Sequence, residues 1–206
     1  ITFNGEIYNY QTLREELIAA GHTFTTKSDT EVLLHGYEQW GVDLLQRVRG
    51  MFTFVIWDKN KQELFGARDH FGIKPFYYAK MNGTFMYASE IKSLLRHPDF
   101  VKELNAEALK PYMTFQYPAI GETFFKGVYK LPEGHYFTYR DGKMDIHRYY
   151  DEDFREGKQK LGKLVNSIDQ TVCDSVKAHQ IADVEVGSFL SSGVDSSYVA
   201  AVARPQ

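Results

Sequence analysis

A charged segment near residue 150 divides the chain into two parts with different sequence patterns. Residues 151–160 read DEDFREGKQK, and Phe154 is their one apolar side chain. Such a composition is typical of a linker between folded domains. We therefore expect one domain over residues 1–150, a linker over residues 151–160 and the start of a second domain over residues 161–206.

The part before the linker carries the signals of antiparallel strands. Residues 51–57 are a dense run of β-branched and aromatic side chains, which predicts a buried strand. Asn82-Gly83 and Asp141-Gly142 are two-residue turn signals, and each predicts a hairpin. The predicted strands cover residues 51–57, 63–67, 76–79, 84–88, 135–139 and 144–149, and the predicted helices cover residues 10–20, 28–41, 42–48 and 105–113.

The part after the linker has a different pattern. Apolar side chains recur at helical spacing over residues 161–176, and the apolar run Val184–Leu190 follows as a predicted strand. Residues 191–197 then read SSGVDSS and lead into a segment with helical character. Antiparallel strands followed by a helix–strand–helix unit predict an α+β domain and then the beginning of an α/β domain.

The end of the chain also has the pattern of a phosphate site. A strand, a loop of small residues and a helix start would gather backbone N–H groups and the positive end of a helix dipole at one point, and both favour an anion. Small side chains allow the backbone to approach the anion closely. An ordinary turn capped by Ser or Asp has the same composition, so the residues by themselves leave both interpretations open.

The charge and hydropathy patterns exclude two classes of partner. The chain has 24 basic and 27 acidic side chains, without the basic stripe that nucleic-acid binding needs. No apolar run reaches the roughly 20 residues that span a bilayer. We therefore expect neither a nucleic-acid partner nor a membrane partner.

Three groups of side chains receive a structural interpretation. Cys173 is the only cysteine, which suits a reducing cytoplasm, and we expect it to be buried. The seven histidines have no metal-ligand spacing, so we expect them to be solvated or hydrogen-bonded. Arg68 and Asp69 lie in a glycine-containing loop, where we expect a buried ion pair or a domain contact.

Several strings along the chain resemble those of one family. The chain opens with ITFNGEIYNY, and SDTEVLLHGYEQWG follows at residues 28–41. The strings RGMFTFVIWD, LFGARDHFGIKPFYY, SEIKSLL, KLPEGHY and DVEVGSFLSSGVDSS begin at residues 49, 64, 89, 130 and 183. In this order, over essentially all 206 residues, the chain resembles the glutamine-hydrolysing asparagine synthetases. The resemblance implies an Ntn-hydrolase-like glutaminase sandwich, followed by the start of an ATP-pyrophosphatase fold.

The resemblance implies roles for four residues in glutamine hydrolysis. Asn4 and Gly5 would form the oxyanion hole, with one side-chain and one backbone N–H donated to the tetrahedral intermediate. Glu6 and Asp29 would bind the α-ammonium group of glutamine. From the residues themselves, the run Ser28-Asp29-Thr30-Glu31 offers caps for the helix that follows, so we expect Asp29 to serve as a cap as well. Without the resemblance, Asn4-Gly5 is interpreted as a plain turn, Glu6 as a solvated side chain and Asp29 as a cap alone.

The resemblance implies a second site in the SSGVDSS loop. Asp195 would hold Mg²⁺ through pyrophosphate, because a hard cation prefers carboxylate oxygen, so ATP and Mg²⁺ are the implied cofactors. The family has glycine where this chain has Ser192, and we expect binding to survive because the backbone N–H remains. The implied ATP- and pyrophosphate-binding residues are Leu190, Ser191, Ser192, Gly193, Asp195 and Ser196.

The implied enzyme is a carbon–nitrogen ligase that acts on glutamine, aspartate and ATP. Glutamine hydrolysis would supply ammonia to aspartyl-AMP, which would give asparagine, AMP and pyrophosphate. The family's nucleophilic N-terminal cysteine and carboxylate-binding arginine match none of the 206 residues, so we expect an internal fragment that is inactive alone. The alternatives are a β-lactam synthetase-like enzyme with another acceptor and a non-catalytic binding module. We expect a cytoplasmic protein, for which a homodimer is one possible state.

Overall fold

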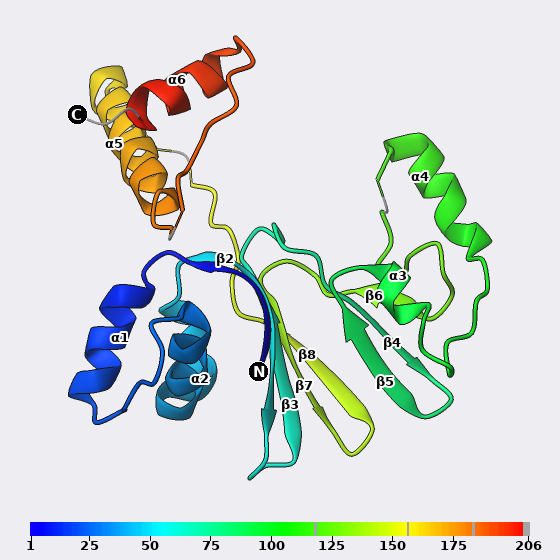
Figure 1. Cartoon of the computed structure of the whole chain (residues 1–206). Helices are drawn as coiled ribbons and strands as arrows, with labels where there is room; N and C mark the ends of the chain where they lie inside the picture. The colour runs from blue at the N-terminus through cyan, green and yellow to red at the C-terminus, as the bar shows by residue number, and fades with distance from the viewer. Residues whose placement is uncertain (118, 156, 183, 204–206) are drawn as a thin grey trace. The chain divides into compact units, whose positions relative to one another are not determined.

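The computed structural model describes residues 1–117, 119–155, 157–182 and 184–203 (Figure 1). The chain divides into two compact units, residues 1–152 and residues 153–206. Glu156 of the predicted linker, Asp183 of the last family string and residues 204–206 lie outside the described residues. Every helix in the described part is too short or too polar to cross a membrane.

The first unit contains a five-stranded antiparallel sheet. The strand order is β1-β2-β3-β7-β8. Its members are β1 Thr2–Ile7, β2 Gly50–Asp58, β3 Glu63–Arg68, β7 His135–Arg140 and β8 Lys143–Arg148. The four strands predicted in this region are confirmed, with ends that differ by one residue at most.

A second antiparallel sheet has three strands in the order β5-β4-β6. They are β4 Tyr77–Met81, β5 Thr84–Ala88 and β6 Val128–Lys130. Both predicted hairpin turns have positive φ angles at their two central residues: 50° and 81° at Asn82 and Gly83, and 50° and 75° at Asp141 and Gly142. Two positive φ angles in succession are typical of type I′ turns, so both hairpin predictions are confirmed.

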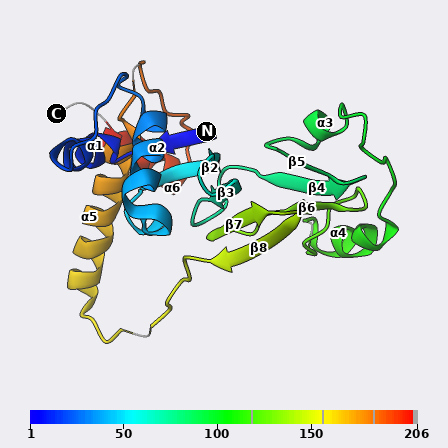
Figure 2. The same ribbon diagram turned by 90° about the horizontal axis from the view of Figure 1, so that it is seen from below.

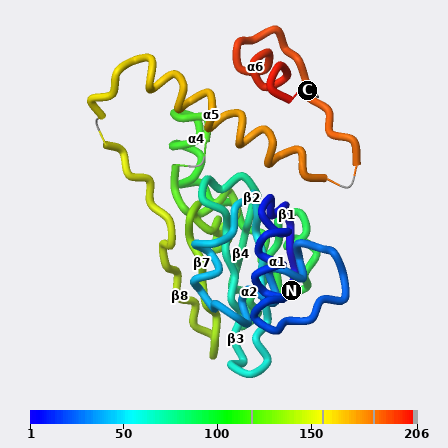
Figure 3. The backbone as a smooth tube through the Cα atoms, turned by 90° about the vertical axis from the view of Figure 1, so that its left-hand side faces the viewer, coloured from blue at the N-terminus to red at the C-terminus, as the bar shows by residue number. Residues whose placement is uncertain are grey.

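Helices cover one face of the larger sheet. The helices α1 Tyr10–Ala19 and α2 Asp29–Trp40 lie against this face, and α2 continues into the 3₁₀ helix η1 Gly41–Gln46 (Figures 1 and 3). The smaller sheet lies against the opposite face of the larger sheet (Figure 2).

The segment predicted as one helix over residues 105–113 is a 3₁₀ turn followed by a short helix. The elements between β5 and β6 are α3 Ile91–Leu94, η2 Ala106–Ala108 and α4 Leu109–Phe115.

Strand β2 is buried on both faces, which explains its continuous apolar sequence. Phe52 and Phe54 pack in the cluster that contains Leu17 of α1. Val55 packs on the opposite face of the strand, in the cluster that contains Phe137. Because successive side chains of a strand point to opposite faces, a strand that is covered on both sides needs apolar residues at nearly every position.

The loop after β3 is built around two buried charged side chains, Arg68 and Asp69. The Asp69 carboxylate accepts hydrogen bonds of 2.9 to 3.2 Å from the backbone N–H groups of Phe52, Phe71, Ile73 and Lys74. The Arg68 guanidinium donates hydrogen bonds of 2.6 to 2.7 Å to the carbonyl oxygens of Gly72, Lys74 and Leu131. Within the described residues, the carboxylate and the guanidinium group are each hydrogen-bonded to the backbone and not to each other. The predicted ion pair is therefore wrong.

The second unit consists of two helices and the segment between them. The helix α5 Leu161–His179 confirms the predicted helix, and α6 Val194–Ala203 ends the described chain. The strand predicted at Val184–Leu190 is wrong, because these residues form neither strand nor helix and Phe189 is 100% exposed. A strand needs a neighbouring strand for its backbone hydrogen bonds, and residues 157–182 and 184–203 contain none.

The segment between α1 and α2 is held by Glu31, on the first turn of α2. The carboxylate accepts hydrogen bonds from the backbone N–H and hydroxyl groups of Thr25 and Thr26, all within 3.0 Å. These bonds lower the pKa of the Glu31 carboxyl group from 4.5 to about 2. The bond from the Thr25 N–H is the largest cause, and the bond from the Thr26 hydroxyl is the second largest. The folded protein therefore stabilises the ionised form of Glu31.

We predict that Asp69→Asn lowers the free energy of unfolding of the first unit by about 3 kcal/mol. The amide keeps the size of the carboxylate but places an NH₂ group against buried N–H donors. Trp40 and Trp57 are the two tryptophans of the chain and both lie in this unit, so tryptophan fluorescence during urea denaturation measures its stability. The matched control is Asp145→Asn on exposed β8, which should change stability by less than about 0.5 kcal/mol. Equal effects of the two variants would contradict this account of the loop.

We predict that Glu31→Gln destabilises the first unit in a pH-dependent way. Because folding depresses the pKa of Glu31, its contribution to stability is complete above about pH 4.5 and is lost as the pH falls towards about 2. The difference in unfolding free energy between the two proteins should therefore shrink between these pH values. Urea denaturation at pH 7 and pH 3 measures it, and a difference that stays constant would show that the carboxylate charge has no role.

Candidate functional site

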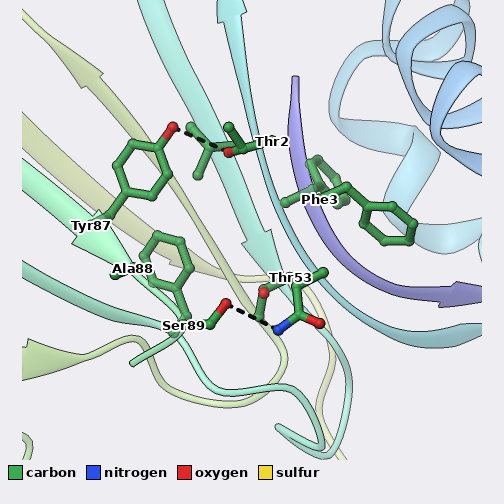
Figure 4. A pocket seen from close by; sticks show the side chains of 10 residues that line it. Thr2, Phe3, Thr53, Tyr87, Ala88 and Ser89 are labelled. Atoms are coloured by element: carbon green, nitrogen blue, oxygen red, sulfur yellow. Dashed lines mark hydrogen bonds between the residues drawn. The ribbon is translucent and has the colours of Figure 1, made fainter. Parts of the chain in front are cut away.

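A cavity of about 250 Å³ lies between the two sheets of the first unit (Figure 4). It is bordered by β1 and β2 of the larger sheet and by β5 of the smaller sheet. Most of its lining is apolar. The polar residues around it are Thr2, Asn4, Thr53, Tyr87 and Ser89.

Asn4 is held in place across this cavity. It lies in β1 opposite Thr53, and its Nδ2 group donates a hydrogen bond of 3.0 Å to the Oγ atom of Ser89. A second bond of 3.1 Å joins the hydroxyl groups of Thr2 in β1 and Tyr87 in β5 (Figure 4). Because an amide NH₂ carries two hydrogens, the bond to Ser89 orients Asn4 and leaves one N–H for another acceptor.

Ser89 is a site residue that the sequence analysis missed. It begins the string SEIKSLL, which contributed to the family resemblance without any assigned role. Ser89 and Asn4 are separated by 85 positions, and no local pattern connects them. Only the stacking of the two sheets brings them together.

Gly5 is required by the close approach of β1 and β2. A Cβ atom at this position would lie 2.1 Å from the carbonyl oxygen of Met51 and 2.7 Å from the Cα atom of Phe52. Both distances are far shorter than a van der Waals contact, so only glycine fits here without moving the strands. Asn4-Gly5 is part of a paired strand, and the interpretation as a plain turn is wrong.

Glu6 and Asp29 lie at the end of β1. Glu6 is exposed and follows Asn4 by two positions, so the two side chains share one face of the strand. The Oδ2 atom of Asp29 accepts a hydrogen bond of 3.1 Å from the backbone N–H of Ile7, which connects the start of α2 to β1. Ser28 is the cap of α2, because its Oγ atom accepts from the Thr30 N–H at 3.1 Å. The prediction that Asp29 caps this helix is wrong.

The loop before α6 forms part of the second predicted site. The Oγ atom of Ser196 lies 3.0 Å from the Oγ atom of Ser191, accepts from the Ser191 N–H at 3.3 Å and donates to the Gly193 carbonyl at 3.1 Å. Asp195 lies in the first turn of α6, and Leu190 is 67% exposed. The small loop and the helix start are therefore present, whereas the strand expected before them is not.

Ser192 has a backbone conformation that favours glycine. Its φ angle is 62°, in the left-handed region, where a residue with a side chain costs roughly 1–2 kcal/mol. Glycine, which the family resemblance implies at this position, would adopt the same conformation without this cost. Cys173, in α5, is half-buried and not buried as expected.

Comparisons with known proteins show which families the two parts of the chain match. Residues 1–150 match the family model of the glutamine amidotransferase domain, and residues 167–206 match that of asparagine synthase. The chain is 46% identical to glutamine-hydrolyzing asparagine synthetase 1 of Bacillus subtilis (strain 168), over 99% of this chain and 32% of the relative. It is 37% identical to glutamine-hydrolyzing asparagine synthetase 3 of the same organism, over 98% of this chain and 33% of the relative. The chain thus spans about a third of the length of these curated relatives.

A solved structure shares the fold. The chain resembles glutamine phosphoribosylpyrophosphate amidotransferase from B. subtilis, complexed with ADP and GMP, with a TM-score of 0.50. The identity is 20%, and the match covers 98% of this chain and 43% of the other. A mixed α+β fold with two stacked sheets is therefore confirmed. Because the family model of residues 1–150 matches more than half of the sequence, the chain belongs to the glutamine amidotransferase domain family.

Proposed function

We propose that this chain is part of a glutamine-hydrolysing asparagine synthetase. In this proposal the first unit hydrolyses the side-chain amide of glutamine, and the second unit begins the part that uses ATP to activate aspartate. The observation that carries the proposal is the Asn4 amide, held by Ser89 at the edge of a cavity and followed by Gly5. The 46% identity to an asparagine synthetase over nearly the whole chain favours this reaction over that of a β-lactam synthetase.

The fixed amide of Asn4 suits the stabilisation of an oxyanion. Hydrolysis of an amide passes through a tetrahedral intermediate with a negative oxygen, and donors that are already oriented stabilise it at no reorganisation cost. Ser89 accepts one N–H of Asn4, so the other N–H is fixed in direction. We assign the second donor to the backbone N–H of Gly5.

Two carboxylates at the end of β1 suit the α-ammonium group of glutamine. Glu6 is exposed on the same strand face as Asn4. Asp29 uses its Oδ2 atom to accept from the Ile7 N–H. Its Oδ1 atom accepts only long bonds of 3.4 and 3.5 Å from the Ser28 and Thr30 hydroxyl groups, which an ammonium group can replace. Charge-assisted hydrogen bonds between ammonium and carboxylate are about twice as strong as neutral ones. We therefore assign the binding of the amino group of glutamine to Glu6 and Asp29.

The loop before α6 suits the phosphate groups of ATP. Ser191, Ser192 and Gly193 are exposed, and the first turn of the ten-residue helix α6 follows them directly. The carboxylate of Asp195 is a hard oxygen donor of the kind that Mg²⁺ prefers, so Asp195 would hold the ion that accompanies pyrophosphate. ATP, when bound, supplies the energy that turns a carboxylate of aspartate into an acyl electrophile. We assign a backbone contact with the nucleotide to Leu190 and phosphate contacts to Ser196.

The proposal also covers the partners of the enzyme and its location in the cell. Its partners are the small molecules glutamine, aspartate and ATP, and the homodimer remains one possible assembly. We place the protein in the cytoplasm, in agreement with its single cysteine.

We predict that Asn4→Ala lowers glutamine-dependent asparagine synthesis by roughly 10²–10³ in a full-length enzyme that carries this chain. The substitution removes one oxyanion donor. Ser89→Ala should have a smaller effect in the same direction, because it removes only the acceptor that orients Asn4. Steady-state rates with glutamine and with ammonium chloride measure both variants.

The rate with ammonium chloride is the internal control. Ammonia enters after the oxyanion has collapsed, so this rate should stay close to that of the unsubstituted enzyme. A loss of the same size with both nitrogen sources would mean that Asn4 supports the fold and not the hydrolysis.

We predict that Asp195→Asn in the same enzyme abolishes asparagine formation with either nitrogen source, while glutamine hydrolysis continues. A neutral amide holds Mg²⁺ poorly, and hydrolysis depends on residues of the first unit. Pyrophosphate and glutamate are measured side by side at saturating ATP. Normal release of pyrophosphate would show that Asp195 only stabilises the start of α6.

A further inference from the structure

Two histidines that are separated by 13 positions meet beside α2. His22 follows the end of α1, and His35 lies in the middle of α2. Their Nδ1 atoms are 3.3 Å apart. The Oε2 atom of Glu38, one turn after His35, lies 2.8 Å from Nδ1 of His35 and 3.8 Å from Nδ1 of His22. One nitrogen from each imidazole and one carboxylate oxygen therefore converge on a common point.

These separations match the edges of a tetrahedral metal site. With Zn–N distances of 2.0–2.1 Å, two ligand atoms of a tetrahedral ion lie about 3.3 Å apart. The Nδ1–Nδ1 distance has this value, and the two distances to Glu38 fall on either side of it. Small movements of the Glu38 side chain, which is 56% exposed, would equalise them.

The Nε2 atoms of both imidazole rings face groups that favour metal binding at Nδ1. The Nε2 atom of His22 lies 2.9 Å from the Oε1 atom of Gln39, an acceptor, so Nε2 carries the hydrogen and Nδ1 presents a lone pair. The Nε2 atom of His35 lies 3.7 Å from a carboxylate oxygen of Glu31. Partners of this kind fix the tautomer and the ring orientation of histidine ligands in metalloproteins.

A hydrogen bond between the rings explains the arrangement less well. Nδ1 of His35 carries at most one hydrogen, and the carboxylate of Glu38 at 2.8 Å is the better acceptor for it. Metal binding would move that hydrogen to Nε2 of His35, which faces the Glu31 carboxylate, and both Nδ1 lone pairs and the Glu38 carboxylate would then face a shared cation. The rings are held there by packing, since the edge of His35 contacts Phe24 and both imidazoles are less than one-fifth exposed.

We propose that His22, His35 and Glu38 bind a divalent transition-metal ion of the Zn²⁺ type, with water at the fourth position. Imidazole nitrogen and carboxylate oxygen are ordinary ligands of this ion, and an exposed Glu38 leaves room for the water. The ion would tie His22, three positions after the end of α1, to the middle of α2. It would act as a structural clip for the segment that leads to Ser28 and Asp29. This site does not depend on the proposed synthetase reaction.

The test is a titration of the 206-residue chain with Zn²⁺ alone, after removal of any affinity tag. Cys173→Ser is used as the background, because a free thiol can bind Zn²⁺ by itself. We expect saturable one-to-one binding by calorimetry and a thermal unfolding midpoint that rises with the metal concentration. The variants His22→Ala, His35→Ala and Glu38→Gln should each lower the affinity by about 10-fold or more.

Matched controls separate this site from general surface binding. Glu38→Gln keeps the size of an exposed side chain, so it tests the proposal even if a histidine variant unfolds. His147→Ala on β8 and Glu15→Gln on α1 replace exposed side chains of the same types and should leave binding unchanged. The proposal is overturned if the unsubstituted chain shows no saturable binding, if Glu38→Gln binds as tightly as its background, or if His147→Ala lowers the affinity as much as Glu38→Gln.

Discussion

The burial of β2 on both faces is the constraint on which the rest of the first unit depends. Phe52 and Phe54 hold the helix layer on one face, and Val55 holds the smaller sheet on the other. Loss of this double packing would separate the layers, because full burial of one large apolar side chain contributes roughly 1.5–3 kcal/mol. The cavity beside Asn4 lies between the two sheets that this packing holds together.

The proposed site follows from how β1 attaches to that strand. Gly5 allows β1 to lie against the backbone of Met51 and Phe52, where any side chain would collide with it. Asn4 then faces the smaller sheet and bonds to Ser89, while Asp29 bonds to the Ile7 N–H from the helix layer. Groups from three layers thus meet at one strand. Side chains with several backbone and side-chain anchors are held precisely enough to stabilise a transition state.

Local features of this fold could be predicted from the sequence, and non-local ones could not. The turns at Asn82-Gly83 and Asp141-Gly142 were predictable, because their conformation depends on two residues. The strand at residues 184–190 was predicted wrongly, since a strand depends on partners outside its own segment. The roles of Asn4 and Asp195 came from family resemblance. The bond from Asn4 to Ser89 and the meeting of His22 with His35 depend on tertiary packing, for which the sequence pattern holds no signal.

The central claim is that Ser89 orients the Asn4 amide so that its second N–H meets the amide oxygen of glutamine. The most direct measurement is a crystal structure of a full-length enzyme carrying this chain, with glutamine bound to a variant that cannot hydrolyse it. We predict that Nδ2 of Asn4 lies within about 3.2 Å of both the Ser89 Oγ atom and the glutamine amide oxygen. Glutamine bound away from β1, or an Asn4 amide that has turned from Ser89 towards another partner, would contradict the account.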